Sequence, residues 1–141
     1  MKIKSLTYLL FVVIVLSLIS CSQSSALPIA GNVDRIIVYT LNTDMQKREY
    51  IDVDRDKIQR VTEEINKAAK TFFDDPEPLG NLYLIVFQHG KKEKTFFYND
   101  MLEYGGKIYS EKSAKKGDVW DLPYEFGELL LGEARIKSID N

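Results

Sequence analysis

Apolar residues recur along this chain at two different spacings. Alternation within short segments rich in β-branched and aromatic residues predicts strands at residues 34–41, 48–53, 82–87, 95–98 and 107–110, with a short edge strand at 119–121. Steps of three and four predict two helices, the first from Asp54 to Phe72 and the second from Pro123 to Leu131. Segment 82–87 (LYLIVF) is apolar on both faces, which is typical of a buried or central strand.

Polar and helix-breaking residues mark the ends of both predicted helices. The apolar stripe of the first helix runs through Ile58, Val61, Ile65, Ala68 or Ala69, and Phe72. Asp54 or Asp56 can cap its first amides, and it must end before the proline-containing acidic loop 74–80. Pro123 suits the start of the second helix, and Gly132 ends it. The basic, polar segment 111–117 predicts an exposed loop.

These elements predict a single α+β domain over residues 34–135. Their order is strand, strand, helix, three strands, a further short strand and a helix, which gives an antiparallel sheet of about 4–6 strands with two helices. Residues 21–33 are mostly small and polar and are typical of a flexible tether. Residues 136–141 are expected to form a frayed tail.

The N-terminus follows a different pattern. Residues 1–20 contain Lys2 and Lys4 but no acidic residue, and the segment from Tyr8 to Leu16 is uninterrupted apolar sequence. A basic start followed by such a run is the layout of a secretory signal peptide. The run is well short of the roughly 20 apolar residues that a membrane-spanning helix needs.

The tetrapeptide Leu18-Ile19-Ser20-Cys21 directly follows the apolar run and resembles the lipobox of bacterial lipoproteins at every position. The resemblance implies cleavage between Ser20 and Cys21 and attachment of a diacylglyceryl group to the Cys21 thiol, so that acyl chains such as palmitate hold the mature chain on the membrane. Two acyl chains make a durable anchor. The alternatives are an ordinary cleaved signal with an incidental cysteine, or an uncleaved helical anchor.

The expected location is therefore the extracytoplasmic face of the cell membrane, and Ser22 is compatible with an outer membrane where the organism has one. Cys21 is the one cysteine of the chain, so no internal disulfide can form. The domain must be stable through core packing alone.

The mature region is similar to small uncharacterised lipoprotein domains of Gram-positive spore-formers. The similarity lies in core positions: Ile36 to Tyr39, Ile58 to Ala69, Leu82 to Phe87 and Leu122-Pro123-Tyr124. It implies the same fold and location and no particular activity.

Composition and charge narrow the classes of partner. The chain has 141 residues, with 19 Lys and Arg against 21 Asp and Glu. Without Lys2 and Lys4 the balance is 17 against 21, a net charge of −4. This balance gives no electrostatic reason to expect a nucleic-acid partner. The sequence contains no glycine-rich phosphate loop, and we expect no cofactor.

Four acidic residues have the spacing of calcium ligands. Asp52, Asp54, Asp56 and Glu63 occupy positions 1, 3, 5 and 12 of an EF-hand loop. Lys57 stands at position 6, where the sharp turn of that loop needs glycine, and a strand rather than a helix is predicted before it. Helix capping and solvation explain these four acids more simply, and we do not expect a metal site here.

The sequence shows no clear set of catalytic residues. His89, the one histidine, falls in a predicted hairpin turn beside Gly90, where the local sequence supplies no acid to orient it. Ser-Lys or paired-carboxylate chemistry has no local signature but remains open. An enzyme is the minority hypothesis.

Aromatic residues are dense in the C-terminal half of the chain: Phe96, Phe97, Tyr98, Tyr104, Tyr109, Trp120, Tyr124 and Phe126. Alternate rings of a strand must lie on opposite faces of the sheet. Rings facing outward beside the basic residues Lys112, Lys115 and Lys116 would suit an envelope protein or a cell-wall component as partner. The competing and preferred interpretation is that these rings fill a core.

The sequence thus predicts a membrane-anchored lipoprotein whose domain is a non-enzymatic binding or accessory module. Its expected partners are the bilayer, through acylated Cys21, and an envelope protein or cell-wall component. The alternatives are an envelope-acting hydrolase that uses acids such as Asp52, Asp54 and Glu63, or a weak divalent-cation-binding protein.

Overall fold

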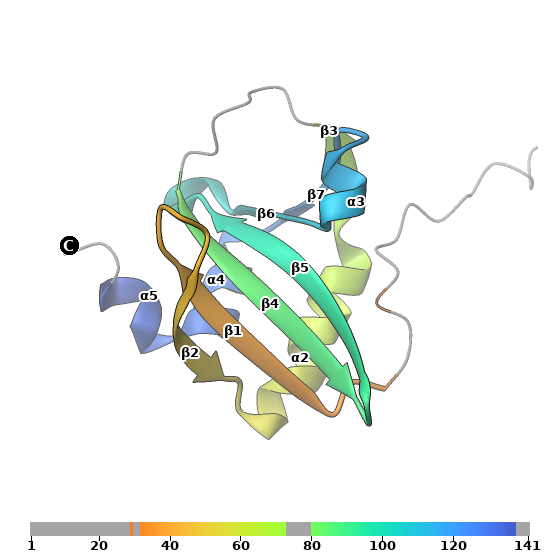
Figure 1. The fold of residues 1–141 in the computed structure, drawn as a ribbon, viewed down its shortest axis with the longest axis vertical. Coiled ribbons are helices and arrows are strands. Elements are labelled where there is room, and N and C mark those ends of the chain that lie inside the picture. Colours follow the sequence, from red (N-terminus) through yellow and green to blue (C-terminus); the bar gives the residue numbers. More distant parts are fainter. Residues whose placement is uncertain (1–28, 30–31, 73–79, 138–141) are drawn as a thin grey trace, which may run out of the picture.

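The computed structural model describes residue 29, residues 32–72 and residues 80–137. These residues form an α+β fold with one antiparallel sheet of seven strands (Figure 1). The strands are β1 (Arg35–Leu41), β2 (Lys47–Asp52), β3 (Ala69–Phe72), β4 (Asn81–His89), β5 (Lys92–Asp100), β6 (Gly106–Tyr109) and β7 (Asp118–Leu122). The helices within these residues are α2 (Arg55–Lys67), α3 (Glu111–Ala114), α4 (Tyr124–Leu131) and α5 (Glu133–Lys137), with a 3-10 turn η1 (Leu102–Tyr104). The predicted α+β class is confirmed, with one strand more than the upper bound that we expected.

The strands are arranged in the order β2-β1-β4-β5-β6-β7-β3. β4 lies between β1 and β5 and is buried from Tyr83 to Phe87, on both faces of the sheet. The prediction of a central strand there is confirmed. Its run of β-branched and aromatic side chains matches an environment that excludes water on both sides.

The two faces of the sheet have different surroundings. One face, which we call the helical face, packs against α2 and α4 and holds most of the core. Figure 1 looks onto the other face, which we call the open face, with α2 and α4 behind the sheet. The strand residues of the core are Ile36, Val38, Tyr83, Ile85, Phe87, Phe96, Tyr98, Ile108, Trp120 and Leu122. Cross-strand pairs such as Val38–Ile85 and Ile85–Phe96 place them on one face.

Helix α2 presents the predicted apolar stripe to the sheet. Ile58, Val61 and Ile65 are buried at steps of three and four residues. Asp54 occupies the capping position, but its side chain makes no capping hydrogen bond. Its Oδ2 instead lies 2.9 Å from Lys57 Nζ. The predicted aspartate cap is wrong, because the carboxylate is engaged by a lysine in the first turn.

The first helix ends at Lys67 and does not continue to Phe72, so the predicted boundary is wrong. Ala68 turns the chain into an extended conformation, with φ −57° and ψ 134°. The next residues form β3, which pairs with β7, and Lys70 Nζ lies 3.0 Å from Asp118 Oδ2 across this pair. Hydrogen bonding to β7 outweighs the helix propensity of alanine and lysine here.

Two further predictions, both for the C-terminal half of the chain, are wrong. β7 is an internal strand between β6 and β3, not an edge strand. The predicted exposed loop 111–117 contains the short helix α3, whose start is fixed by reciprocal bonds between Ser110 and Ser113. Ser113 N donates to Ser110 Oγ over 3.1 Å, and Ser110 N donates to Ser113 Oγ over 2.9 Å. This capping box gives hydrogen-bond acceptors to backbone amides that a short helix would otherwise leave without one.

The ends of the described chain are tied to the domain. Ile29 is 2% exposed and belongs to the core, and Val33 packs against it. At the other end α4 follows Pro123 and stops at Gly132, as predicted, and α5 follows directly. Arg135 of α5 is buried with 4% of its surface exposed.

Candidate functional site

Ser20 and Cys21, the predicted cleavage and lipidation residues, lie outside the described residues. Their roles stay predictions. None of the helices in the described part of the chain is long and apolar enough to cross a membrane.

Three of the four acids with calcium-ligand spacing, Asp52, Asp54 and Glu63, each contact a different side chain. Asp52, at the end of β2, accepts two bonds from Arg35 Nε, over 3.0 and 3.1 Å, and one from its Nη2. The hydrogen bonds and charge of Arg35 lower the pKa of Asp52. Glu63 accepts a hydrogen bond from Gln59 Nε2 over 2.9 Å. Asp56 lies in the first turn of α2. Among the described residues, no three acids, histidines or cysteines come together in a way that could hold a metal ion.

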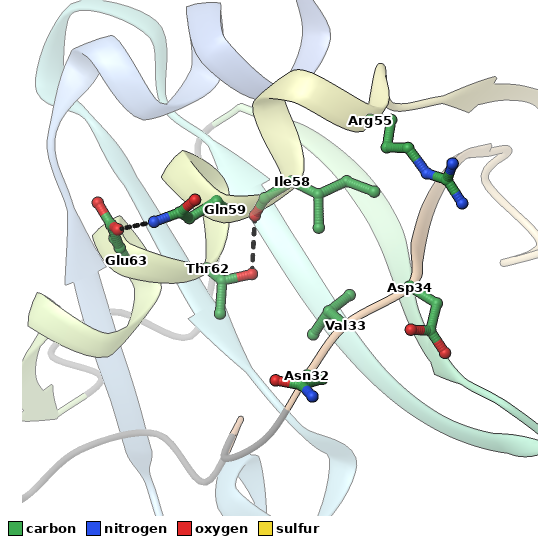
Figure 2. Close-up of a pocket in the computed structure, with 8 residues that line it drawn as sticks. All are labelled: Asn32, Val33, Asp34, Arg55, Ile58, Gln59, Thr62 and Glu63. Atoms are coloured by element: carbon green, nitrogen blue, oxygen red, sulfur yellow. Dashed lines mark hydrogen bonds between the residues drawn. The ribbon is translucent and has the colours of Figure 1, made fainter.

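A polar pocket of about 590 Å³ lies between residues 32–34 and residues 55–63 of α2 (Figure 2). Its lining residues are Asn32, Val33, Asp34, Arg55, Ile58, Gln59, Thr62 and Glu63. In Figure 2, Asp34 and Arg55 lie at one end and Glu63 at the other. The polar groups between them are bonded locally, since Thr62 Oγ1 donates to Ile58 O and Gln59 to Glu63. The two acids of the pocket therefore do not converge on a common point.

His89 has a carboxylate neighbour that the local sequence does not reveal. Its Nδ1 lies 3.2 Å from Asp34 Oδ2, which also accepts a hydrogen bond from Gly90 N over 2.7 Å. Asp34 N in turn donates to Gln88 O over 2.8 Å. The local sequence supplies no orienting acid, as expected, and the carboxylate comes instead from residue 34, which lies beside the distant turn. The imidazole is exposed, as predicted, and the contacts fix the turn between β4 and β5.

A row of apolar side chains crosses five neighbouring strands on the open face. Tyr50 of β2 is opposite Tyr39 of β1, Tyr39 is opposite Leu84 of β4, Leu84 is opposite Phe97 of β5, and Phe97 is opposite Tyr109 of β6. We call these five residues the aromatic row. Residues directly opposite in antiparallel strands share a face, so all five lie on the open face.

The aromatic row has rings at both ends and an aliphatic centre. The Tyr39 and Tyr50 ring centroids are 6.1 Å apart, and those of Phe97 and Tyr109 are 5.6 Å apart with an angle of 29° between the ring planes. Leu84 in the centre is 8% exposed, whereas Tyr50 is 63% exposed. Burial raises the pKa of the Tyr109 hydroxyl. The Tyr50 end of the row therefore offers ring surface to a partner, whereas Phe97 and Tyr109 at the other end are half-buried and Leu84 in the middle is shielded by its neighbours.

Lysines flank the row at both ends. Lys47 Nζ lies 4.4 Å from the centre of the Tyr39 ring, a cation–π contact. At the other end a hollow of about 460 Å³ separates Phe97 from α3. Its lining residues are Thr95, Phe97, Ser110, Glu111, Lys112 and Lys115. The open face thus combines apolar contact area with ammonium groups, which suits noncovalent binding.

The remaining predicted aromatic residues divide between the core and other surfaces. Phe96, Tyr98, Trp120 and Phe126 are buried, as the core interpretation predicted. Phe97 and Tyr109 lie half-buried on the open face, and Phe97 shares a hollow with Lys112 and Lys115. Tyr104 and Tyr124 are exposed outside the aromatic row. The sequence reasoning missed Tyr39 and Tyr50 as members of the patch. The alternation of apolar residues in the first hairpin could have placed each of the two rings on one face of its own strand, but the register that brings them together cannot be read from it.

A buried charge cluster escaped the sequence reasoning altogether. Arg135 donates to both oxygens of Asp100 over 2.8 Å, and to the carbonyl oxygens of Tyr124 and Leu102 over 3.1 and 3.3 Å. Burial opposes the guanidinium charge of Arg135, but Asp100 outweighs it and raises the arginine pKa. Burial and the charge of Asp100 raise the pKa of Tyr98, whose hydroxyl lies 3.5 Å from Asp100 Oδ1. With every charge paired, this cluster is structural in character.

No protein-family model matches this chain, and the comparisons with curated proteins and with solved structures return no similar protein.

Proposed function

We propose that this protein is a lipid-anchored, extracytoplasmic binding module that holds an envelope protein on its open face. The anchor is the acylated Cys21, and the contact surface is the aromatic row with its flanking lysines. The role is non-enzymatic: the domain positions a partner at the membrane surface.

The sequence supports the anchor. The basic start, the short apolar run and the tetrapeptide ending in Cys21 occur in the order that lipoprotein processing needs. Ile29 begins the described packing eight residues after Cys21, so a short connection would keep the domain close to the bilayer.

The observation that carries the binding role is the alignment of the aromatic row across five strands on a face that α2 and α4 leave uncovered. Protein interfaces commonly have an apolar, aromatic centre and a polar rim. The row supplies such a centre, and the lysines in and just after α3 supply part of a rim.

Charge favours a partner with acidic groups around its contact area. Lys112 and Lys116 are exposed, and no ion pair to either is formed within the described part of the chain. Their positive charge stands out on a mature chain whose net charge is −4. Carboxylates of the partner would be drawn to this end of the face.

The hydrolase and cation-binding alternatives receive less support from the geometry. Asp52, Asp54 and Glu63 each have a different neighbour, Arg35, Lys57 and Gln59 respectively. A hydrolase of the paired-carboxylate type needs two acids facing one substrate bond.

The anchor is tested by Cys21→Ser with labelled fatty acid in growing cells. We expect the label on the wild-type protein and an unlabelled, uncleaved precursor for the variant. Label that persists on the variant would refute lipidation at Cys21.

The binding face is tested by chemical crosslinking in intact cells. The variant Lys112→Glu/Lys116→Glu reverses two exposed charges in and just after α3, of which Lys112 lines the hollow beside Phe97. The matched control Lys91→Glu/Lys92→Glu reverses two exposed charges in and beside the β4–β5 turn. We expect one adduct of reproducible mass with the wild type and the control, and its loss in the first variant.

Equal adducts from both variants, or no adduct from the folded wild type, would contradict the proposal. An adduct whose added mass is removed by cell-wall hydrolases, and which contains no second polypeptide, would show a glycan partner, which also contradicts it.

A further inference from the structure

Strand β2 forms one edge of the sheet, and half of its backbone groups face away from β1. Val53 N, just after β2, donates to Ile36 O over 3.0 Å, and the backbone of Glu49 exchanges hydrogen bonds with Thr40 Oγ1 over 3.2 and 3.4 Å. Residues 49, 51 and 53 therefore direct their peptide groups toward β1. Because antiparallel ladders alternate, Arg48, Tyr50 and Asp52 direct theirs toward the open edge.

In the sheet of the described residues, β1 is the one strand beside β2. Residues 47–50 are all exposed, and the Tyr50 side chain stands on the open face at this edge. An edge of this kind accepts a further strand through main-chain hydrogen bonds.

We propose that two copies of this chain associate by antiparallel pairing of β2 with β2, centred on Tyr50. In this register Tyr50 lies opposite the second copy's Tyr50, and Arg48 lies opposite the second copy's Asp52. The outward peptide groups of all three residues then find partners, which gives six main-chain hydrogen bonds by the alternation of an antiparallel ladder.

The charges of β2 favour a second copy over other strands. Charged residues on an edge usually discourage pairing, but the sequence Lys47-Arg48-Glu49-Tyr50-Ile51-Asp52 is complementary to itself when it is reversed about Tyr50. Two Arg48–Asp52 pairs form between the copies, in addition to the Arg35–Asp52 pair within each copy, and no like charges lie directly opposite each other on the paired strands. A shift that centres the pairing on Glu49 would place two glutamates face to face, which is unfavourable.

The symmetry of this pairing suits the arrangement of the rest of the molecule. Its two-fold axis is perpendicular to the sheet, so both open faces point the same way and the two aromatic rows meet at Tyr50. Lys112 and Lys115, in and just after α3, lie at the far ends of the joined row and stay accessible. The association does not depend on the proposed partner, and two anchors in one bilayer would raise the effective concentration of the copies.

Oxidative crosslinking of the full chain, purified from membranes in mild detergent, tests the register. In Tyr50→Cys the paired Cα atoms would be about 5.5 Å apart, within the range of a disulfide. In the matched control Glu49→Cys they would be about 8 Å apart, beyond it. We expect a covalent dimer from Tyr50→Cys alone, and the wild type controls for pairing through Cys21.

Sedimentation of the same preparations tests the association without a crosslink. Arg48→Asp would place acids opposite each other at two positions, and we expect it to weaken the dimer at least about tenfold. Lys91→Asp, with the same change of charge in the β4–β5 turn, should leave the dimer intact. Circular dichroism checks that each variant is folded.

A monomer at all concentrations for the wild type, or a crosslink from Glu49→Cys rather than Tyr50→Cys, would overturn the proposed pairing. Either result leaves the open-face proposal standing, since that proposal is tested through Lys112 and Lys116.

Discussion

Arg135 and Asp100 form a two-point ion pair inside the domain, with Nε and Nη2 of the arginine each 2.8 Å from a different carboxylate oxygen. The side chains are 5% and 0% exposed, respectively. The pair joins α5 to the end of β5 across 35 residues of sequence. Because α5 is short, this pair is a main attachment of the C-terminal segment to the sheet.

Replacement of Arg135 by methionine should destabilise the domain strongly. It leaves the Asp100 carboxylate buried without its cation, which typically costs about 3–5 kcal/mol. Denaturant unfolding of the wild type and the variant measures the difference. The exposed pair of Arg35 with Asp52 provides the control, and Arg35→Met should cost much less. Equal losses from the two variants would contradict the structural role of Arg135.

Gly127→Ala should destabilise the protein, although alanine is the better helix former. Gly127 lies within α4, where this change in an exposed helix would gain about 1 kcal/mol. A Cβ at residue 127 would lie 2.7 Å from Arg135 Cζ and 2.9 Å from its Nη2. The guanidinium must then move away from Asp100. A variant that unfolds at a higher denaturant concentration than the wild type would contradict the prediction, because it would show that the added Cβ does not disturb the Arg135–Asp100 pair.

The Asp52–Arg35 pair should contribute to the acid dependence of stability. The pKa of Asp52 is lowered in the folded protein, so the folded state holds this proton less tightly than the unfolded chain. The stabilisation is therefore complete above about pH 4 and is lost as the pH falls through the folded pKa. Free energies of unfolding for the wild type and Asp52→Asn should differ at neutral pH and converge in acid. A gap that stays constant with pH would refute this assignment.

The spacing of apolar residues predicts the elements whose burial is decided locally. The stripe Ile58, Val61 and Ile65 predicts α2, and the two-sided apolar run in β4 predicts the central strand. Gly132, as the stop signal after α4, is likewise readable from the chain. These features need no knowledge of distant partners.

The sequence-based predictions fail where a segment far away in the sequence determines the local structure. Residues 69–72 continue the helical spacing of α2, but they form β3 because β7, about fifty residues later, offers them a strand to pair with. Asp34 orients His89 across 55 residues for the same reason. The register between β1 and β2, which joins Tyr39 and Tyr50 to the aromatic row, follows from a bulge near Leu41 that the alternation does not reveal.

The central claim is that a protein partner lies against the open face. It is tested most directly by a photoreactive aromatic residue placed at Phe97, within the aromatic row, and at the control position Tyr104, which is 85% exposed in η1 outside the row. Intact cells carrying each full-length variant are irradiated, and the adducts are identified by mass. The proposal predicts a defined protein adduct from position 97 and none from position 104. Equal labelling from both positions, or labelling from position 104 alone, would contradict it.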